Sequence, residues 1–397
     1  MIATYSISFR GGLASGASAL AIEQSLGTKS ASREIADEHG ARVVEIDEGS
    51  GMVRIAFPAV NLGSIPTLLV AVVGEALETQ DFDRLRLISL EFPEAWFAPY
   101  QGPRFGIKGI RGLLGIADRP LLIAILKPSV GLAPDEAASL AASLARGGAD
   151  IIKDDELASA VSGHDPVERA RAVSEALAWV EAETLRPCVY TANITGPVDG
   201  LTEMAESLSD LGNVWPMVAE HAIGLDALRV LAGGSGGIGG DGGASRPILC
   251  HRAYSGAVSR SADFGTDAAV LAGLARLCGG DLIHCGGIGG KLFDTHEGAL
   301  ASMASCRRPL AHLKPSLPII GGGYWAGSVG AVMRAIGDNG FGFVLGSGVT
   351  DHPDGAEAGM RSVAIALEAE LGGEGIESVL DRPEIARAID HYGAVWQ

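Results

Sequence analysis

The sequence predicts an α/β fold: a TIM (β/α) barrel preceded by a ferredoxin-like α+β N-terminal domain. From about residue 121, eight short apolar runs alternate with Ala- and Leu-rich amphipathic segments, which is the pattern that a barrel needs. The runs are nearly continuous in apolar residues, as is typical of parallel strands covered on both faces. The preceding part of the chain instead indicates antiparallel strands around a helix. We therefore expect two domains, at residues 1–110 and 111–397.

In the N-terminal domain we expect one helix and five strands. The segment LASGASALAIEQSLG, residues 13–27, predicts a helix between the first two strands. A helix inserted in this way between strands of a small sheet fits a ferredoxin-like domain. The expected strands are residues 3–9, 41–47, 52–59, 67–74 and 82–92.

In the barrel, functional side chains are expected where the strands end, because TIM-barrel sites lie at the C-terminal face. Amphipathic segments such as DPVERARAVSEALAWVEAE predict the covering helices. The apolar runs that predict the barrel strands are residues 121–127, 149–156, 186–195, 213–219, 246–253, 281–287, 317–323 and 342–348.

The charge balance excludes some classes of partner. With 30 basic and 48 acidic residues, the net charge is −18, which disfavours nucleic acid and anionic membranes but leaves room for a local pocket that binds a small anion. The five cysteines form no CxxC pair, which indicates buried reduced thiols. We find no signal peptide and no apolar run of about 18 residues, so we expect a cytoplasmic protein.

The 56 glycines fall into two kinds of segment. The run GGSGGIGGDGG, at 233–243, contains a formal GxGxxG, but no strand leads into it, so we interpret it as a flexible linker. The clusters CGGIGG, GGG and GSG follow the last three predicted strands. Glycine there lets backbone N–H groups approach an anion, and TIM barrels often bind phosphate in these loops.

The motif KDDE, at 153–156, predicts a metal site. Alternation along a strand points Lys153 and Asp155 the same way, and Glu156 follows as the strand ends. Two converging carboxylates suit a hard cation such as Mg²⁺. An ammonium cannot ligate a metal, so Lys153 must either neutralise the carboxylates or be modified. The alternative is an exposed ion pair at the strand end.

Other strand ends also carry polar residues. His251 and Arg252 follow the fifth predicted strand, and Arg252 could offer its guanidinium to a phosphate. Alternatively, His251 could be a core residue and Arg252 a surface residue. A glycine-rich loop with a single lysine, HCGGIGGKLF, predicts a mobile lid that closes over substrate. In order along the chain, the polar residues at these strand ends are Lys127, Asn193, His251, Arg252, His284 and Lys291.

The ordered motifs KPSVGL, GGADIIKDDE, HRA, DLIHCGGIGGKL, LPIIGGG and LGSGVTDHPDG resemble the large subunit of ribulose bisphosphate carboxylase (RuBisCO). EQSLGT near the N-terminus and PYQGPRFGI at the domain junction resemble it too, so the likeness covers almost the whole chain. It implies a homodimer whose active sites lie between the barrel of one subunit and the N-terminal domain of the other.

The resemblance also implies roles for individual residues. Lys153 would be carbamylated by CO₂ and would hold Mg²⁺ with Asp155 and Glu156. Lys127 matches a catalytic lysine after the first barrel strand, and Lys291 matches the lysine of a mobile loop. The matched substrate-binding positions are Arg252 and His284 for one phosphate, Thr28, Gly322, Gly323, Gly346 and Ser347 for the other, His251 near the substrate hydroxyls, and Asn193 at the third strand end.

Departures from the carboxylase pattern fall on substrate-contacting positions. Ser129 replaces a lysine, Lys29 a tryptophan, Gly321 a serine and Ser255 a histidine, while Glu75 aligns with a metal-proximal asparagine. The metal motif is intact. The chain therefore resembles the RuBisCO-like proteins (form IV), which keep metal-assisted enolisation and lose CO₂ fixation.

The expected function is Mg²⁺-dependent enolisation of a phosphorylated keto-sugar or sugar acid by an isomerase, tautomerase or decarboxylase, because Mg²⁺ can polarise a carbonyl as the enolate forms. The expected catalytic residues are Lys127, Lys153, His251, Lys291 and Glu75. Three alternatives stay open: a methionine-salvage diketo-methylthiopentyl phosphate enolase, which has a lysine where Glu75 aligns, a genuine ribulose bisphosphate carboxylase, and a non-catalytic regulatory relative.

Overall fold

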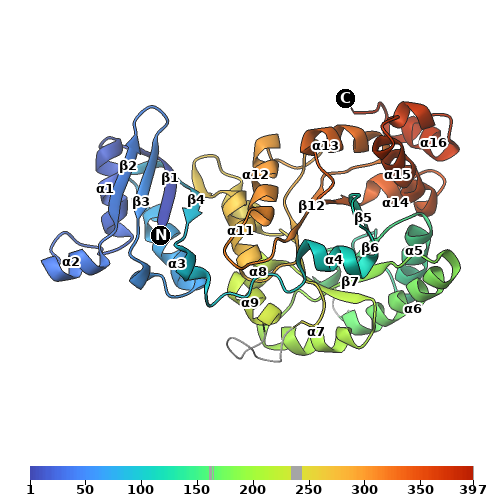
Figure 1. The fold of residues 1–397 in the computed structure, drawn as a ribbon, viewed down its shortest axis with the longest axis horizontal. Helices are drawn as coiled ribbons and strands as arrows, with labels where there is room; N and C mark the ends of the chain where they lie inside the picture. The colour runs from blue at the N-terminus through green and yellow to red at the C-terminus, as the bar shows by residue number, and fades with distance from the viewer. Residues whose placement is uncertain (161–162, 164, 234–243, 397) are drawn as a thin grey trace.

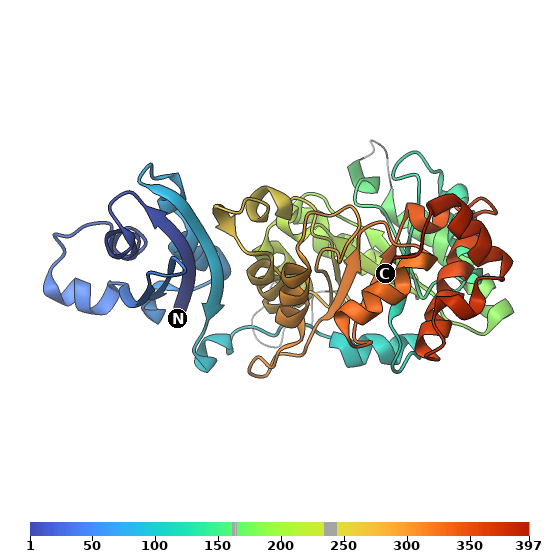
Figure 2. The ribbon, with the colours of Figure 1, turned by 90° about the horizontal axis from the view of Figure 1, so that it is seen from above.

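The computed structural model describes residues 1–160, 163, 165–233 and 244–396, and Figure 1 shows their arrangement. A small N-terminal domain lies beside a larger barrel, and the view from above shows the same two bodies side by side (Figure 2). Apart from Gly233, the predicted linker at 233–243 lies outside the described residues.

The N-terminal domain has the expected ferredoxin-like topology. In the described part of the chain its sheet has the order β10-β4-β1-β3-β2, and β1 pairs antiparallel with both β3 and β4. Helices α1 and α2 follow β1 and helix α3 follows β3, which gives the βαββαβ order of that fold with one additional short helix, α2. The elements are β1 (Ile2–Phe9), α1 (Leu13–Glu23), α2 (Arg33–His39), β2 (Arg42–Asp47), β3 (Met52–Ala56), η1 (Ala59–Asn61), α3 (Ile65–Val73), η2 (Glu75–Glu78), β4 (Phe82–Glu91) and η3 (Glu94–Phe97).

One expected strand of this domain is wrong, because residues 67–74 belong to helix α3 and its C-cap. The Ser64 hydroxyl accepts from the N–H of Thr67, and the Thr67 hydroxyl accepts from the N–H of Ser64 at 2.9 Å, which is a capping box. Pro66 in the first turn adds a second start signal. The apolar run conceals a helical period, since its buried residues are Ile65, Leu68 and Val72.

The barrel is confirmed. In the described residues eight parallel strands close in the order β11-β12-β13-β5-β6-β7-β8-β9, and each lies within one of the predicted runs. The strands are β5 (Leu121–Ile125), β6 (Ile151–Lys153), β7 (Val189–Asn193), β8 (Val214–Val218), β9 (Leu249–Cys250), β11 (Leu282–His284), β12 (Leu317–Gly321) and β13 (Gly342–Leu345).

Helices surround the barrel, as Figure 1 shows. The longer ones are α5 (Pro134–Arg146), α6 (Pro166–Thr184), α7 (Leu201–Ser209), α9 (Leu225–Gly233), α11 (Ala268–Leu277), α12 (His296–Arg307), α13 (Val329–Ile336), α15 (Ala356–Leu371) and α16 (Pro383–Tyr392). The shorter ones are η4 (Ala158–Ala160), η5 (Val198–Gly200), α8 (Glu220–Ile223), α10 (Ser255–Ser259), η6 (Ala326–Ser328), α14 (Ser347–Thr350) and η7 (Ile376–Val379).

Helix α4 (Gly106–Leu114) closes one end of the barrel. Its Ile110 and Leu114 are buried in the cluster of apolar side chains inside the barrel. The buried carboxylate of Asp281 accepts hydrogen bonds from the N–H groups of Phe105 and Gly106, both at 2.8 Å, and so anchors the start of the helix. Only the opposite end of the barrel is left for a site. The expected domain boundary at 110 lies within α4 and stays a prediction.

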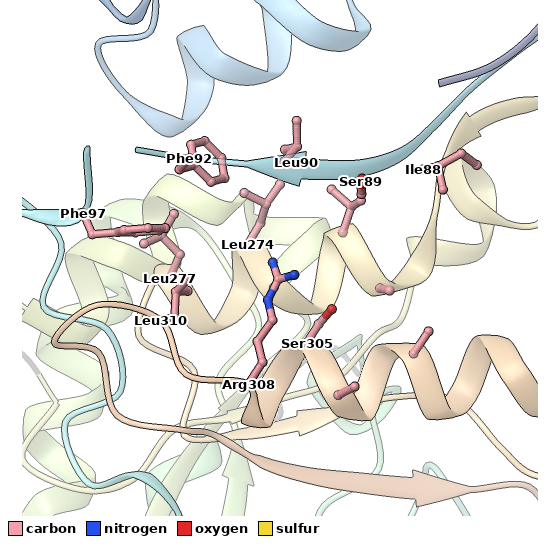
Figure 3. A pocket seen from close by; sticks show the side chains of 15 residues that line it. Ile88, Ser89, Leu90, Phe92, Phe97, Leu274, Leu277, Ser305, Arg308 and Leu310 are labelled. Carbon is pink, nitrogen blue, oxygen red and sulfur yellow. The ribbon is translucent and has the colours of Figure 1, made fainter. Parts of the chain in front are cut away.

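A strand from the barrel half joins the two domains. Strand β10 (Phe264–Thr266) pairs in parallel with β4 and extends the N-terminal sheet. Next to this pairing, a crevice of about 280 Å³ separates β4 from α11 and α12. Figure 3 shows Leu274 and Leu277 below β4 and the Arg308 side chain extending from the end of α12 toward the strand, while the Leu90 side chain points to the other side of β4. This crevice lacks the clustered carboxylates and lysines that an enolising site needs.

Two further observations bear on the composition. All five cysteines are free and buried, as expected from the sequence. Among the helices of the described residues, none combines the length and the apolar character needed to cross a bilayer.

Candidate active site

A cavity of about 800 Å³ opens at the C-terminal ends of the barrel strands. Loops that follow β5, β6, β9, β11, β12 and β13 contribute to its walls. Most of the residues singled out from the sequence meet here, because parallel strands of a barrel present their carboxyl ends at one face. The predicted residues that line the cavity are Lys127, Glu156, His251, Arg252, His284, Lys291, Gly322, Gly323, Gly346 and Ser347.

Lys153 and Asp155 lie beneath this surface. Lys153 is the last residue of β6 and is fully buried, and its Nζ donates to the carbonyl of Asp154 at 2.7 Å. The same Nζ lies 3.8 Å from Glu156 Oε2. Burial lowers the pKa of Lys153, although the neighbouring carboxylates act against the shift. At a given pH the buried amine of Lys153 is therefore neutral more often than the amine of a surface lysine.

Lys127 holds the Asp155 carboxylate. Its Nζ donates to Asp155 Oδ2 at 2.6 Å and to the Ser129 hydroxyl at 2.8 Å. Burial alone would raise the pKa of Asp155, but the bonds from Lys127 and from the Leu157 N–H outweigh it, so this pKa lies below its ordinary value. Asp155 is thus ionised and oriented. Ser129, which replaces a lysine of the carboxylase pattern, is a partner of Lys127 here.

A buried ion pair between Asp154 and Arg169 fixes the turn that follows β6, and its role was not predicted from the sequence. The Asp154 carboxylate, fully buried, accepts from Arg169 Nε of α6 at 3.1 Å. Because side chains alternate along a strand, Asp154 points away from Lys153 and Asp155. A signal was present: Arg169 occupies the buried stripe of α6 and is the one cation there.

Asn193 supports the same turn rather than lining the cavity. Its amide nitrogen donates to the carbonyls of Asp155 and Glu156, both at 3.0 Å, and its amide oxygen accepts from the N–H of Thr195 at 3.0 Å. The side chain is buried. These bonds fix the backbone that carries the Asp155 and Glu156 carboxylates, and the expected contact of Asn193 with substrate stays a prediction.

Two histidines present the same ring nitrogen to the site. Nδ1 of His251 accepts from the N–H of Ala253, and Nδ1 of His284 accepts from the N–H of Gly286, each at 3.2 Å. Nε2 therefore carries the proton in each neutral ring. His251 Nε2 lies 3.4 Å from Glu156 Oε2. Burial lowers the pKa of both rings, that of His284 to about 3, so both are uncharged at neutral pH.

Arg252 is already paired. Its Nη1 donates to Asp294 Oδ1 at 2.8 Å, its Nε donates to the Ser255 hydroxyl at 3.3 Å, and its guanidinium lies over the Phe293 ring at 5.5 Å. Asp294 was missed from the sequence, because nothing local marks a carboxylate that meets an arginine 42 residues away.

The glycine-rich loop after β11 lies against the end of β12. The N–H of Lys291 donates to the Gly322 carbonyl at 3.1 Å, and the Tyr324 hydroxyl accepts from the N–H of Ile288 at 2.7 Å. A Cβ at Gly287 would lie 2.3 Å from the Gly321 carbonyl oxygen, so only glycine allows this approach. Lys291 is exposed at the cavity. The expected lid motion of this loop stays a prediction.

Thr28 and Glu75 do not reach this cavity within one chain. Both are exposed and belong to the N-terminal domain, Thr28 in the loop after α1 and Glu75 at the start of η2. Thr28 and Lys29 line a separate hollow against α1. In Figure 1, α1 and α2 lie on the side of the domain away from the barrel.

Whether the KDDE turn could hold Mg²⁺ depends on Lys153. Among the described residues, no group of three or more His, Cys, Asp or Glu side chains is arranged to hold a metal ion. Asp155 and Glu156 supply two hard oxygen donors, which suit Mg²⁺, and Lys153 supplies a nitrogen that cannot serve as a ligand while it is an ammonium. The residues fit the ion once Lys153 carries an oxygen group.

The fold and this site define a class of protein. The family model for the ribulose bisphosphate carboxylase large chain, catalytic domain, matches residues 106–392, and the model for its N-terminal domain matches residues 1–96. The chain belongs to the ribulose bisphosphate carboxylase large-chain family.

Within this family the chain is similar to RuBisCO-like proteins and to archaeal RuBisCO. It is 35% identical over 341 residues to a ribulose bisphosphate carboxylase-like protein of Chlorobaculum thiosulfatiphilum, covering 85% of this chain and 76% of the relative. It is 31% identical over 382 residues to the ribulose bisphosphate carboxylase of Pyrococcus furiosus, covering 94% and 89%. The solved structure of a dimeric archaeal Rubisco from Hyperthermus butylicus matches with a TM-score of 0.88 at 28% identity, covering 99% and 96%. The resemblance inferred from the motifs is confirmed.

Proposed function

We propose that this protein is a Mg²⁺-dependent enzyme that enolises a phosphorylated keto-sugar or sugar acid and does not fix CO₂. The observation that carries the proposal is the intact KDDE turn, buried and braced by Lys127, Asn193 and Arg169, at the floor of a cavity of about 800 Å³. Three of the departures from the carboxylase pattern, Ser129, Ser255 and Gly321, line this cavity and leave the turn itself unchanged.

Lys153, Asp155 and Glu156 would hold the ion. The neutral amine of Lys153 would add to CO₂, giving a carbamate and releasing one proton, and the carbamate would supply the third oxygen donor. Mg²⁺ held there would polarise the substrate carbonyl and lower the cost of forming an enolate. Because Lys127 binds Asp155 at 2.6 Å, its ammonium balances the negative charge of the floor.

The residues around the floor would orient the substrate. His251 presents a proton on Nε2 and so can donate a hydrogen bond to a substrate hydroxyl near Glu156. Backbone N–H groups around Gly322, Gly323, Gly346 and Ser347 would bind a phosphate, and glycine lets that anion come close. Lys291, exposed beside Gly322, would close over it.

A homodimer would complete the site, because Thr28 and Glu75 are exposed and neither lines the cavity of its own chain. The N-terminal domain of the partner would then bring Thr28 to the phosphate and Glu75 to the reacting carbon, where its carboxylate could accept the α-proton. We also place the protein in the cytoplasm, in agreement with its free buried thiols.

The test is solvent deuterium incorporation, followed by NMR, over a panel of phosphorylated keto-sugars and sugar acids with Mg²⁺ and bicarbonate. We expect exchange of one α-proton for at least one compound, and its loss when Mg²⁺ is chelated. If no compound exchanges, enolisation is excluded for the panel and a non-catalytic relative is favoured. A Glu75→Gln variant with an unchanged exchange rate would remove Glu75 from the mechanism.

A genuine carboxylase is the second candidate, and the match to the Pyrococcus furiosus carboxylase favours it. Fixation of ¹⁴CO₂ with ribulose bisphosphate tests it directly. We expect no fixation, because Ser129 takes the place of a lysine and Gly321 the place of a serine. A serine Cβ at 321 would lie 3.0 Å from His284 Nε2, so His284 is packed against a glycine here.

A further inference from the structure

The crevice between β4, α11 and α12 is separate from the cavity at the barrel mouth. Its volume is about 280 Å³, and none of its described lining residues also lines that cavity. Its apolar walls come from both domains, with Ile88 on β4, Phe92 just beyond it, and Leu274 and Leu277 on α11. An engineered apolar cavity of about 150 Å³ binds benzene, so this crevice has room for a ligand of about ten to twelve non-hydrogen atoms.

One charged side chain, that of Arg308, enters this apolar crevice. Among the described residues that line it, none is acidic and Arg308 is the only charged one. The neighbouring Arg307 pairs with Asp338 at 2.6 Å, whereas Arg308 has no such ion pair within the described part of the chain. Figure 3 shows the Arg308 guanidinium and the Ser305 hydroxyl both directed toward β4. The crevice therefore has apolar walls and one cationic group.

A second arginine lies behind Arg308. The fully buried side chain of Arg276 donates to the carbonyl of Arg308 at 2.6 Å and to that of Leu313 at 3.0 Å. These bonds fix the chain at the end of α12 and cover carbonyls that would repel an anion. Burial lowers the pKa of Arg276 to about 10, and the charge of Arg308 acts in the same direction, so both side chains are cations at neutral pH. A bound anion would relieve the repulsion between them.

A buried hydroxyl lies beside the two cations. Ser305 of α12 lines the crevice and is only 9% exposed. Its hydroxyl has no hydrogen-bond partner among the residues that the structure describes. A buried hydroxyl without a partner has lost the hydrogen bonds that it makes with water, and a ligand oxygen would restore one.

A glycine within a helix keeps part of the crevice open. Gly273 lies in the interior of α11 and lines the crevice, although glycine weakens a helix. A Cβ at this position would lie 3.8 Å from the Ser305 Cβ, which is ordinary contact. Packing therefore does not require glycine here, and a larger side chain would enter the space.

We infer that this crevice binds an apolar monocarboxylate of about ten to twelve non-hydrogen atoms, with its carboxylate at Arg308 and Ser305 and its apolar part between α11 and β4. The cation selects the head group, because apolar walls alone would accept any apolar molecule. On a chain with a net charge of −18, an anion needs such local positive charge. This site is additional to the proposed function and does not depend on it.

Calorimetry with three eight-carbon probes tests the choice of head group. Octanoate, octanol and octylammonium are titrated into the full-length protein at neutral pH. We expect octanoate to bind once per chain with a Kd below about 1 mM, and the other two to bind at least about tenfold more weakly, because they lack a carboxylate for Arg308.

Two variants test the location. Arg308→Gln removes the cation, and we expect the affinity for octanoate to fall about tenfold or more. Gly273→Leu fills the crevice, and we expect octanoate binding to be lost. The matched controls are Arg382→Gln, at an exposed arginine, and Gly112→Leu, at an exposed glycine of α4 with no atom within 4 Å of an added Cβ. Both controls should bind octanoate as the wild type does.

The inference is overturned if octanoate does not bind the wild type, which is also the result expected if a second subunit covers the crevice. Equal affinities for the three probes, or an unchanged affinity in Arg308→Gln, would exclude selection by the cation and overturn it as well. Octanoate binding retained in Gly273→Leu would place the ligand elsewhere. If this variant does not fold, Ala304→Trp fills the crevice from α12 instead. Octanoate binding without α-proton exchange on any sugar phosphate would keep this inference and overturn enolisation alone.

Discussion

The floor and the rim of the cavity are built in opposite ways. On the floor, after β6, charged side chains lie against charged partners, as Asp155 does against Lys127 and the buried Asp154 against the buried Arg169. On the rim, after β11 and β12, backbone meets backbone at glycines, and the charged side chain of Lys291 is exposed. The difference teaches that the floor is organised for fixed charge and the rim for close approach of a ligand and for movement.

Removing the floor's central amine should have the largest effect. Lys153→Met takes away the group that we expect to complete the ligand set with Asp155 and Glu156. We expect Mg²⁺-dependent deuterium exchange to fall by more than about 10²-fold, measured by NMR. Lys108→Met, at an exposed lysine of α4, is the control and should keep full exchange. If Lys153→Met kept Mg²⁺-dependent deuterium exchange, the fixed charges of the floor would not be needed for the reaction, and the distinction between floor and rim would fail.

Breaking the brace beneath the floor should cost stability. Arg169→Leu leaves the fully buried Asp154 carboxylate without its cation, and we expect the free energy of unfolding to fall by about 3–5 kcal/mol in denaturant titrations. The control is Arg146→Leu, because the Arg146–Glu183 pair is exposed and is expected to contribute less than about 1 kcal/mol. Equal losses in the two variants would contradict the buried role of Arg169.

On the rim, adding a methyl group to a glycine should lower stability, as the loss of a charged partner does on the floor. In Gly290→Ala the added Cβ would lie 2.1 Å from the Gly322 carbonyl oxygen, at a φ of 73°. We expect a loss of about 1–3 kcal/mol and a weaker affinity for ribitol 5-phosphate. Gly112→Ala in α4 has no atom within 4 Å of the new methyl and should be neutral or stabilising by about 0.4–1 kcal/mol. An unchanged Gly290→Ala variant would show that the loop is not packed as described.

The smallest effect concerns a buried acid behind the rim. Glu220 lines a small space with Arg252 and His284, its Oε2 has no partner among the described residues, and burial raises its pKa from 4.5 to about 8. His221, 3.4 Å away, has a pKa lowered by burial to about 4 and stays neutral across this window.

Glu220 should therefore make stability depend on pH. Between pH 4.5 and 8 the folded state keeps a proton that the unfolded state has lost, so stability falls as the pH rises through this window. We expect Glu220→Gln to match the wild type near pH 5 and to have a Tm higher by about 2–5 °C at pH 9. The exposed Glu374→Gln serves as the control. If the Tm difference between Glu220→Gln and the wild type is the same at both pH values, the proton on Glu220 is not the cause of the difference.

Much of the fold could be predicted because its signals are local. Each of the eight barrel strands coincides with an apolar run, and the KDDE turn was recognisable from four adjacent residues. The strand expected at 67–74 is wrong because its apolar residues were counted without the capping box that starts α3. A strand of three residues, β10, was not expected at all, since its pairing with β4 depends on how the domains meet.

The site was harder to predict wherever two distant segments meet. Asn193 carries the right chemistry to bind a ligand, and only its buried hydrogen bonds to Asp155 and Glu156 show that it is already engaged. Thr28 and Glu75 were expected at the site from their match to the family, yet neither lines the cavity of its own chain, so their part in the site stays a prediction.

The sequence by itself determined the class of fold, the KDDE motif and the face of the barrel that carries the candidate site, because periodicity and strand ends are properties of contiguous residues. Only the tertiary structure decided the state of each charge. Lys153 is buried, Asp155 is bound by Lys127, and Arg252 is neutralised by Asp294. These states depend on burial and on partners that folding brings from other strands, and such contacts leave no mark in the local order of residues.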